Sequence, residues 1–92
     1  MNEHHIEQAL KTAVEADGGL CWKLVSPSTT GVPDRICLKA GRAVFVEVKA
    51  PGRKPRPIQL RRMNQIRQQG FDTFVVDSTG GIKEVLDALQ AA

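Results

Sequence analysis

The chain has 92 residues, of which 41% are hydrophobic and 25% are charged, and its formal net charge is +3. This length and composition are ordinary for one small globular domain, so we expect residues 1–92 to form a single domain. No apolar run approaches the roughly 18 residues that a membrane-spanning helix needs, and the polar start is unlike a signal peptide. The composition therefore predicts a cytoplasmic protein with no membrane contact and no organic cofactor.

Apolar residues recur at helical spacing in some segments and form strand-like runs in others. In chain order these patterns predict a helix over 2–16, strands over 20–25, 33–38 and 43–49, a helix from Pro57 to about Gly70, a strand over 71–76 and a helix over 82–89. Both faces of the central hairpin are largely apolar, so both need cover. The pattern indicates an α/β fold of order αβββαβα, with helices on both faces of the sheet.

The two cysteines, Cys21 and Cys37, lie in strand-like apolar runs and have neither CxxC spacing nor a neighbouring histidine. Two buried, reduced thiols are the expected state, and a structural disulfide or a metal site is the alternative.

A tight turn at Ala40-Gly41 would set the register of the hairpin. Residue 38 then faces 43, 36 faces 45, and Asp34 lies directly opposite Glu47, with Cβ atoms roughly 4.5–5.5 Å apart. Lys49 projects from the same face as Glu47 because side chains alternate along a strand. Two opposed carboxylates repel each other unless a positive charge lies between them, so this arrangement predicts a functional site.

The chemistry of this set is that of metal-dependent phosphodiester hydrolysis. Asp34 and Glu47 are hard oxygen ligands for Mg²⁺ or Mn²⁺, and the backbone carbonyl of Val48 could be a further ligand. Lys49 could position or deprotonate the attacking water, or neutralise charge on the phosphate. The alternative is a salt-bridged hairpin in which Glu47 pairs with Lys49 and Asp34 caps the loop.

Two polar residues on the predicted helices could join this site. Glu7 lies at the margin of the first helix's apolar stripe and could reach the metal, through a water molecule; Glu3, one turn earlier, competes for that role. An acid near a helix N-terminus is also favoured by the helix dipole alone. Gln59 starts a core-facing row of the second helix and could orient the centre, or else cap that helix.

Seven of the thirteen Lys and Arg residues lie between Lys49 and Arg67, and no acid occurs from Ala50 to Phe71. Such a one-sided segment suggests a polyanionic partner, although a solvated helix face is the simpler alternative. The candidates for contact with a DNA backbone are Arg53, Lys54, Arg56, Arg61, Arg62 and Thr30. Arg35 faces away from Asp34 and is interpreted as a structural or surface partner, and Trp22 is expected in the core rather than stacked on a base.

The segments 31–35 (Gly-Val-Pro-Asp-Arg), 45–52 (Phe-Val-Glu-Val-Lys-Ala-Pro-Gly) and 57–59 (Pro-Ile-Gln) together resemble the signature of the VRR-NUC family, within the PD-(D/E)xK nuclease superfamily. The resemblance implies a restriction-endonuclease-like αβββαβ core with a mixed sheet, and a metal-dependent endonuclease of the small standalone phage or bacterial type. It also implies that branched DNA, such as a four-way (Holliday) junction, could be the substrate. A catalytically silent DNA-binding module and an RNA-cutting relative are the alternatives.

Symmetric cutting of two strands needs two sites, so a homodimer is expected. Strand edges and the apolar stripe of the last helix offer a surface for it; that stripe consists of Ile82, Val85, Leu86 and Leu89.

Overall fold

A mixed sheet of four strands in the order β1-β2-β3-β4 forms the centre of the computed structural model, which describes residues 1–90. The elements in chain order are α1 (Glu3–Ala16), β1 (Leu20–Lys23), β2 (Arg35–Lys39), β3 (Arg42–Val48), α2 (Pro57–Gln68), β4 (Asp72–Val76), a 3₁₀ turn (Thr79–Gly81) and α3 (Ile82–Gln90). The predicted αβββαβα order is confirmed, and most element ends differ from the prediction by no more than two residues.

The first three strands pair antiparallel, whereas β4 pairs parallel to β3 after the crossover through α2. In the β2–β3 hairpin, Arg35 faces Val46 and Ile36 faces Phe45, which is the predicted register. The turn between these strands places Ala40 and Gly41 at positive φ, as a two-residue hairpin turn with the right-handed strand twist requires. The local turn therefore fixes which side chains of β3 share a face.

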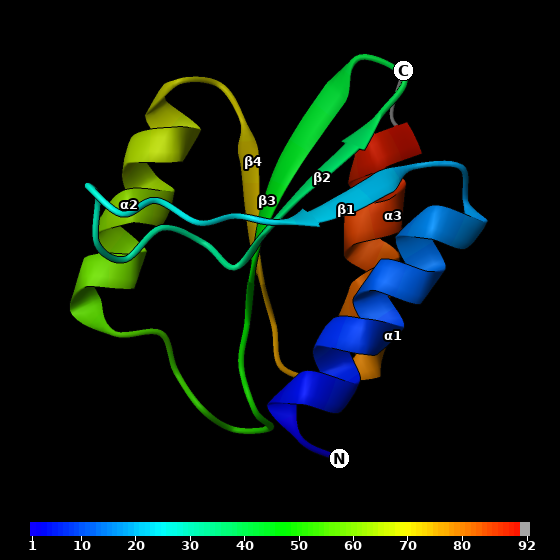
Figure 1. Cartoon of the computed structure of the whole chain (residues 1–92), viewed down its shortest axis with the longest axis horizontal. Coiled ribbons are helices and arrows are strands. Elements are labelled where there is room, and N and C mark those ends of the chain that lie inside the picture. Colours follow the sequence, from blue (N-terminus) through cyan, green and yellow to red (C-terminus); the bar gives the residue numbers. More distant parts are fainter. Residues whose placement is uncertain (91–92) are drawn as a thin grey trace.

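Helices α1 and α3 lie side by side against one face of the sheet, and α2 stands on the other (Figure 1). Between the sheet and the α1–α3 layer lies the hydrophobic core, to which α1 contributes Ile6, Leu10 and Val14, β3 contributes Val44, Val46 and Val48, and α3 contributes Ile82, Val85 and Leu89. Burial of each such side chain stabilises the fold by about 1.5–3 kcal/mol.

The apolar stripe of α3 is part of this core, which corrects the expectation that it forms a dimer surface. Val85 and Leu89 are 0% and 1% exposed, and Leu86 packs against the same cluster. The stripe cannot serve as a dimer surface, because it already covers the sheet and α1 of its own chain.

Cover on the other face is incomplete. α2 packs mainly against β4, and its buried residues are only Gln59 and Met63. Trp22 is consequently 57% exposed and Leu20 is 46% exposed, since no helix lies over β1 on this side. The expectation of a core position for Trp22 was wrong for this reason.

Within residues 1–90, every helix is too short or too polar to cross a membrane.

Candidate active site

Asp34 and Glu47 meet where β2 begins and β3 ends. Asp34 immediately precedes β2, and its Oδ2 accepts a hydrogen bond from the backbone N–H of Val48 at 2.8 Å. Glu47 lies one residue before the end of β3, with its side chain fully buried. The hairpin register thus brings the two acids together as predicted.

The two carboxylate oxygens of Glu47 have different surroundings. Oε2 accepts from Nε2 of Gln59 at 2.5 Å and lies 3.1 Å from Nζ of Lys49. Oε1 is buried and has no hydrogen-bond partner among the described residues. Burial raises the pKa of Glu47 and the charge of Asp34 raises it further, while Lys49 and the backbone N–H of Asp34 oppose the shift. A buried carboxylate oxygen without a donor is costly, so its position suits a cation ligand.

Gln59 is the third residue of α2 and uses both ends of its amide. Its Oε1 accepts the backbone N–H of Arg56 at 2.7 Å, which caps the helix, while its Nε2 donates to Glu47. Pro57 starts the helix where no backbone donor is needed. One side chain therefore both caps the helix and ties the start of α2 to Glu47, so the two alternatives that the sequence left for Gln59 are compatible.

Lys49 follows β3 directly and is held in place by its backbone N–H, which donates to the carbonyl of Val76 at 2.9 Å. Its side chain is 17% exposed. A hollow of about 340 Å³ borders it and is lined by Glu3, Lys49, Ala50, Arg53 and Lys54. The ammonium group of Lys49 therefore stands between the buried carboxylate and a basic surface hollow.

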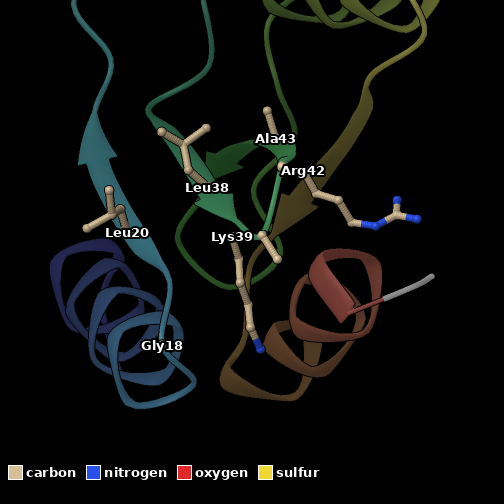
Figure 2. A pocket seen from close by; sticks show the side chains of 8 residues that line it. Gly18, Leu20, Leu38, Lys39, Arg42 and Ala43 are labelled. Carbon is tan, nitrogen blue, oxygen red and sulfur yellow. The ribbon is translucent and has the colours of Figure 1, made fainter.

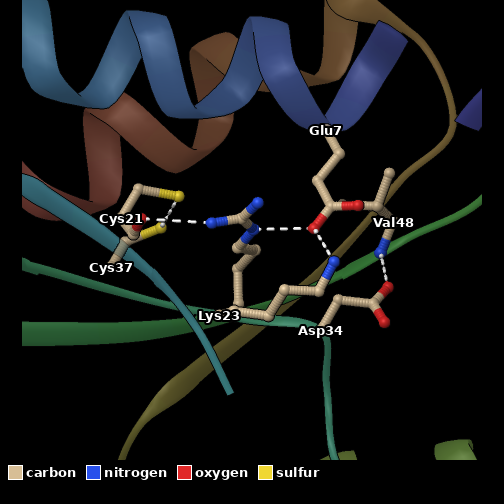
Figure 3. Close-up of polar contacts among 7 residues, drawn as sticks. Glu7, Cys21, Lys23, Asp34, Cys37 and Val48 are labelled. Atoms are coloured by element: carbon tan, nitrogen blue, oxygen red, sulfur yellow. Dashed lines mark hydrogen bonds and ion pairs between the residues drawn. The ribbon is translucent and has the colours of Figure 1, made fainter. Parts of the chain in front are cut away.

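Glu7 is buried in a different ion-pair cluster. Its Oε2 lies 2.7 Å from Nε of Arg35 and 3.3 Å from Nζ of Lys23, and Arg35 also donates to the carbonyl of Cys21 (Figure 3). Burial alone would raise the pKa of Glu7, but the hydrogen bonds and charges of Arg35 and Lys23 outweigh it and lower this pKa. The interpretation of Arg35 as a structural partner is confirmed.

Lys23 was not anticipated by the sequence analysis. It ends β1 as the register partner of Arg35, so the two basic residues share the face toward α1. The signal was present in the sequence, because Lys23 interrupts an otherwise apolar run.

The candidate metal ligands are the two acids of the β2–β3 hairpin, Asp34 and Glu47, and not a larger cluster of acidic side chains. Within residues 1–90, no group of three His, Cys, Asp and Glu side chains is arranged to hold one ion. Asp34 and Glu47 supply carboxylates, and Figure 3 shows Glu7 and Asp34 directed toward Val48 from α1 and from the start of β2. Asp34 and the unpaired Oε1 of Glu47 would suit a hard divalent cation whose other ligands are backbone oxygen and water.

The predicted DNA-binding residues fall into two groups. Arg53 and Lys54 are exposed and line the hollow beside Lys49, and Arg56 and Arg61 are exposed near the start of α2. Arg62 is half-buried instead, and its Nε donates to the carbonyl of Thr30 at 2.8 Å. Arg62 and Thr30 thus join the loop before Asp34 to α2.

A second hollow, of about 470 Å³, lies at the far end of the hairpin (Figure 2). It is lined by Leu20, Leu38 and Ala43 together with Lys39 and Arg42, and Lys39 is paired with Asp17 at 3.1 Å. Arg42 and Glu47 stand near opposite ends of β3, which corresponds to a separation of roughly 16 Å. This hollow has no carboxylate in its lining and is separate from the candidate active site.

Comparison with known proteins gives a consistent identity, although no family model matches the chain. The chain is 44% identical over 79 residues to "Putative nuclease p44" of Acyrthosiphon pisum secondary endosymbiont phage 1, covering 85% of each protein. A solved structure named "VRR_NUC domain" is 33% identical, with a TM-score of 0.84 over 92% of this chain and 94% of that chain.

A further solved structure, a "VRR_NUC domain protein", has a TM-score of 0.81 at 14% identity, over 100% of this chain and 91% of that chain, and it supports the fold alone. The expected restriction-endonuclease-like fold is confirmed by these structures. The sequence relative and the first structure together establish that the chain belongs to the VRR-NUC family of nucleases.

Proposed function

We propose that this nuclease hydrolyses DNA phosphodiester bonds with Mg²⁺ or Mn²⁺ held by Asp34, Glu47 and the backbone carbonyl of Val48. The observation that carries the proposal is the buried Oε1 of Glu47, to which no side chain of residues 1–90 donates a hydrogen bond and which lies beside a second carboxylate. Without a cation, the cost of burying Glu47 beside Asp34 is offset only in part by Lys49 and Gln59. A divalent ion there would supply Lewis-acid activation of water and of the phosphate.

The residues around the pair keep it in one geometry. Gln59 engages Oε2 of Glu47, which leaves Oε1 as the free ligand atom. The backbone N–H of Val48 holds Oδ2 of Asp34, so the second carboxylate cannot turn away. Such supporting contacts are typically worth a factor of about 10–100 in metal affinity or activity.

Lys49 would bind and orient the attacking water and would stabilise the negative charge that develops on the phosphate. Its Nζ already lies 3.1 Å from Glu47, with access to the basic hollow. Glu7 would act on the ion through water, while its Oε2 stays paired with Arg35 and Lys23. Glu3, which lines the hollow with Lys49, would face the substrate rather than the ion.

Arg53 and Lys54, with Arg56 and Arg61, would hold the DNA backbone beside the site, whereas Arg62 and Thr30 would shape the loop that presents Asp34. Phosphate contacts of this kind supply affinity without sequence selectivity. We propose branched DNA, such as a four-way junction, as the preferred substrate and a homodimer as the active form. The uncovered face of β1, with Leu20 and Trp22, is the surface that a second copy would cover, since α3 is unavailable.

The test uses a labelled four-way junction, a linear duplex, single strands and an RNA duplex, each with Mg²⁺, Mn²⁺ or EDTA. The expected result is metal-dependent cutting of the junction that Asp34→Asn, Glu47→Gln and Lys49→Ala each abolish while DNA binding persists. Lys11→Ala is the matched control, because Lys11 pairs with Glu15 on the outer surface of α1. Binding without cutting in every metal would instead favour a catalytically silent DNA-binding module.

A further inference from the structure

We propose that Cys21 and Cys37 form a reversible disulfide across β1 and β2 when a hydroperoxide oxidises them, and that this bond restrains the loop presenting Asp34. The two thiols are register partners on adjacent antiparallel strands, both are buried, and their Sγ atoms lie 3.7 Å apart (Figure 3). The nuclease site does not use them. Formation of the bond is independent of the proposed function.

The hydrogen-bond pattern of the strand pair shows that the backbones already suit such a bond. The N–H of Leu24 donates to the carbonyl of Asp34, the residue opposite, at 2.8 Å. Hydrogen-bonded and non-hydrogen-bonded pairs alternate along antiparallel strands, so Cys21 and Cys37 form a non-hydrogen-bonded pair. The Cα atoms of such a pair are about 4.5 Å apart, within the 4.4–6.8 Å range that disulfides span but near its short end.

That separation makes the bond both accessible and reducible. The sulfur atoms need only approach to about 2.05 Å, which rotation of the two side chains can provide without a shift of either strand. Disulfides near the limit of the allowed geometry are strained and open more readily to thiol reductants. β1 is a four-residue strand at the sheet edge, where local opening gives a small oxidant access to the buried pair.

The two cysteines have different chemical roles in the reaction. The S–H of Cys37 points at Sγ of Cys21, which lowers the pKa of Cys21, while the same contact and burial raise the pKa of Cys37. The Cys21 thiolate attacks the hydroperoxide: an S–O bond forms, the O–O bond breaks, and the alcohol leaves with a proton. The Cys37 sulfur then displaces the sulfenic hydroxyl of Cys21, an S–S bond forms, and the hydroxyl leaves as water with the proton of Cys37.

The position of this bond connects it to the nuclease site. It would close a covalent ring around residues 22–36, which contains the loop before Asp34 and Asp34 itself. Lys23 lies two residues after Cys21, and Arg35 lies two residues before Cys37, so both project from the same face of the sheet as the cysteines. Both form ion pairs with Glu7. Oxidation would therefore restrict the motion of the loop that carries Asp34. It would also restrict Lys23 and Arg35, which bind Glu7.

The experiment treats the folded, reduced protein with hydrogen peroxide at pH 7.5, unfolds it in N-ethylmaleimide, and measures the intact and peptide masses. The expected product binds no maleimide, has lost about 2 Da, and contains no disulfide between chains. Its Tm should rise by about 10 °C or more and return to its original value after dithiothreitol treatment. Hydrogen exchange of residues 26–33 should slow in the oxidised form. Peptide masses separate this change from oxidation of Met1 and Met63.

Cys37→Ala is the matched control: it should keep one reactive thiol, lose no hydrogen pair and show no rise in Tm with peroxide. Because the chain has only two cysteines, every intramolecular disulfide must be this one. The proposal is overturned if peroxide-treated protein still binds two maleimides, if it carries sulfinic or sulfonic acids instead of a disulfide, or if its disulfides join two chains.

Discussion

The two faces of the central sheet show how one short strand serves both stability and chemistry. Toward α1 and α3, β3 presents Val44, Val46 and Val48, all at 2% exposure or less and all packed against apolar side chains. Toward α2, the same strand presents Phe45 and Glu47, and the buried helix residues beside them include the polar Gln59. The first face stabilises the fold. The second buries the carboxylate of Glu47, which is unfavourable unless a cation binds it.

The largest effect is expected from removing one acid of the polar face. Asp34→Asn should reduce metal-dependent cutting by a factor of about 10³, because one of the two carboxylate ligands is lost. The metal-free variant should also be more stable by about 1 kcal/mol, since repulsion toward buried Glu47 disappears. Cutting assays and thermal unfolding in EDTA measure both changes. A less stable variant would show that the acids do not oppose each other in the metal-free protein.

A truncation on the apolar face should lower stability and leave activity unchanged, the opposite of the effect at Asp34. Leu10→Ala removes a fully buried side chain and should lower the free energy of unfolding by about 2–5 kcal/mol, without lowering activity per folded molecule. Leu60→Ala is the matched control, because Leu60 is 52% exposed on α2 and its truncation should leave stability within about 0.5 kcal/mol. Urea titrations measure the difference. Equal losses at the two positions would contradict the division between the faces.

The sequence predicted the polar face better than its surroundings, for physical reasons. The register of Asp34 and Glu47 depends on a two-residue turn and on the period of two, which are both local. Which helix covers which face of the sheet depends on tertiary contacts. The apolar stripe of α3 indicated that this face is buried but not which surface covers it, and in the structure it packs against the sheet and α1 of its own chain. Trp22 was misplaced for the same reason, because nothing near it in sequence tells that α2 stops short of β1.

The ion pairs of Glu7 illustrate the same limit. Position on α1 indicated that Glu7 would be near the sheet, and burial confirms this. Its partners Arg35 and Lys23 come from two other elements, so only tertiary placement of α1 on the hairpin decides whether Glu7 meets a basic residue or a metal.

Gln59 offers a sharper test of how α2 supports the polar face. Gln59→Ala should remove the hydrogen bond to Glu47 and the cap on Arg56 together, and lower metal affinity or activity by about 10–100-fold. Gln59→Glu separates the two roles, because it keeps an acceptor for the cap but loses the donor to Glu47. Calorimetric titration of Mn²⁺ should show weak binding in both variants, with helix stability lost only in the first. Full affinity in Gln59→Glu would exclude a positioning role.

The pH dependence of stability should report on Glu47, the buried acid of the polar face. Its pKa is raised by burial and by Asp34, so the folded protein binds this proton more tightly than the unfolded chain does. The resulting stabilisation is complete below the ordinary pKa of a glutamic acid and is lost as pH rises through the raised value. A divalent ion requires the ionised form, so the rise in Tm on adding Mg²⁺ should be larger at pH 8 than at pH 5. Asp34→Asn should reduce this difference, and a metal effect independent of pH would argue against Glu47 as a ligand.

The smallest effect is expected at the rim of the polar face. Arg53→Ala combined with Lys54→Ala removes two exposed charges beside Lys49 and should weaken DNA binding several-fold at moderate salt. The slope of log affinity against log salt concentration should fall by about 2, one for each phosphate that the variant no longer neutralises. Lys83→Ala is the matched control, since Lys83 is an exposed lysine that pairs with Asp87 on α3. Fluorescence anisotropy in Ca²⁺ or EDTA measures binding without cutting. If the slope is unchanged in the double variant, the phosphates are held elsewhere, and the exposed start of α2 with Arg56 and Arg61 becomes the surface to neutralise next.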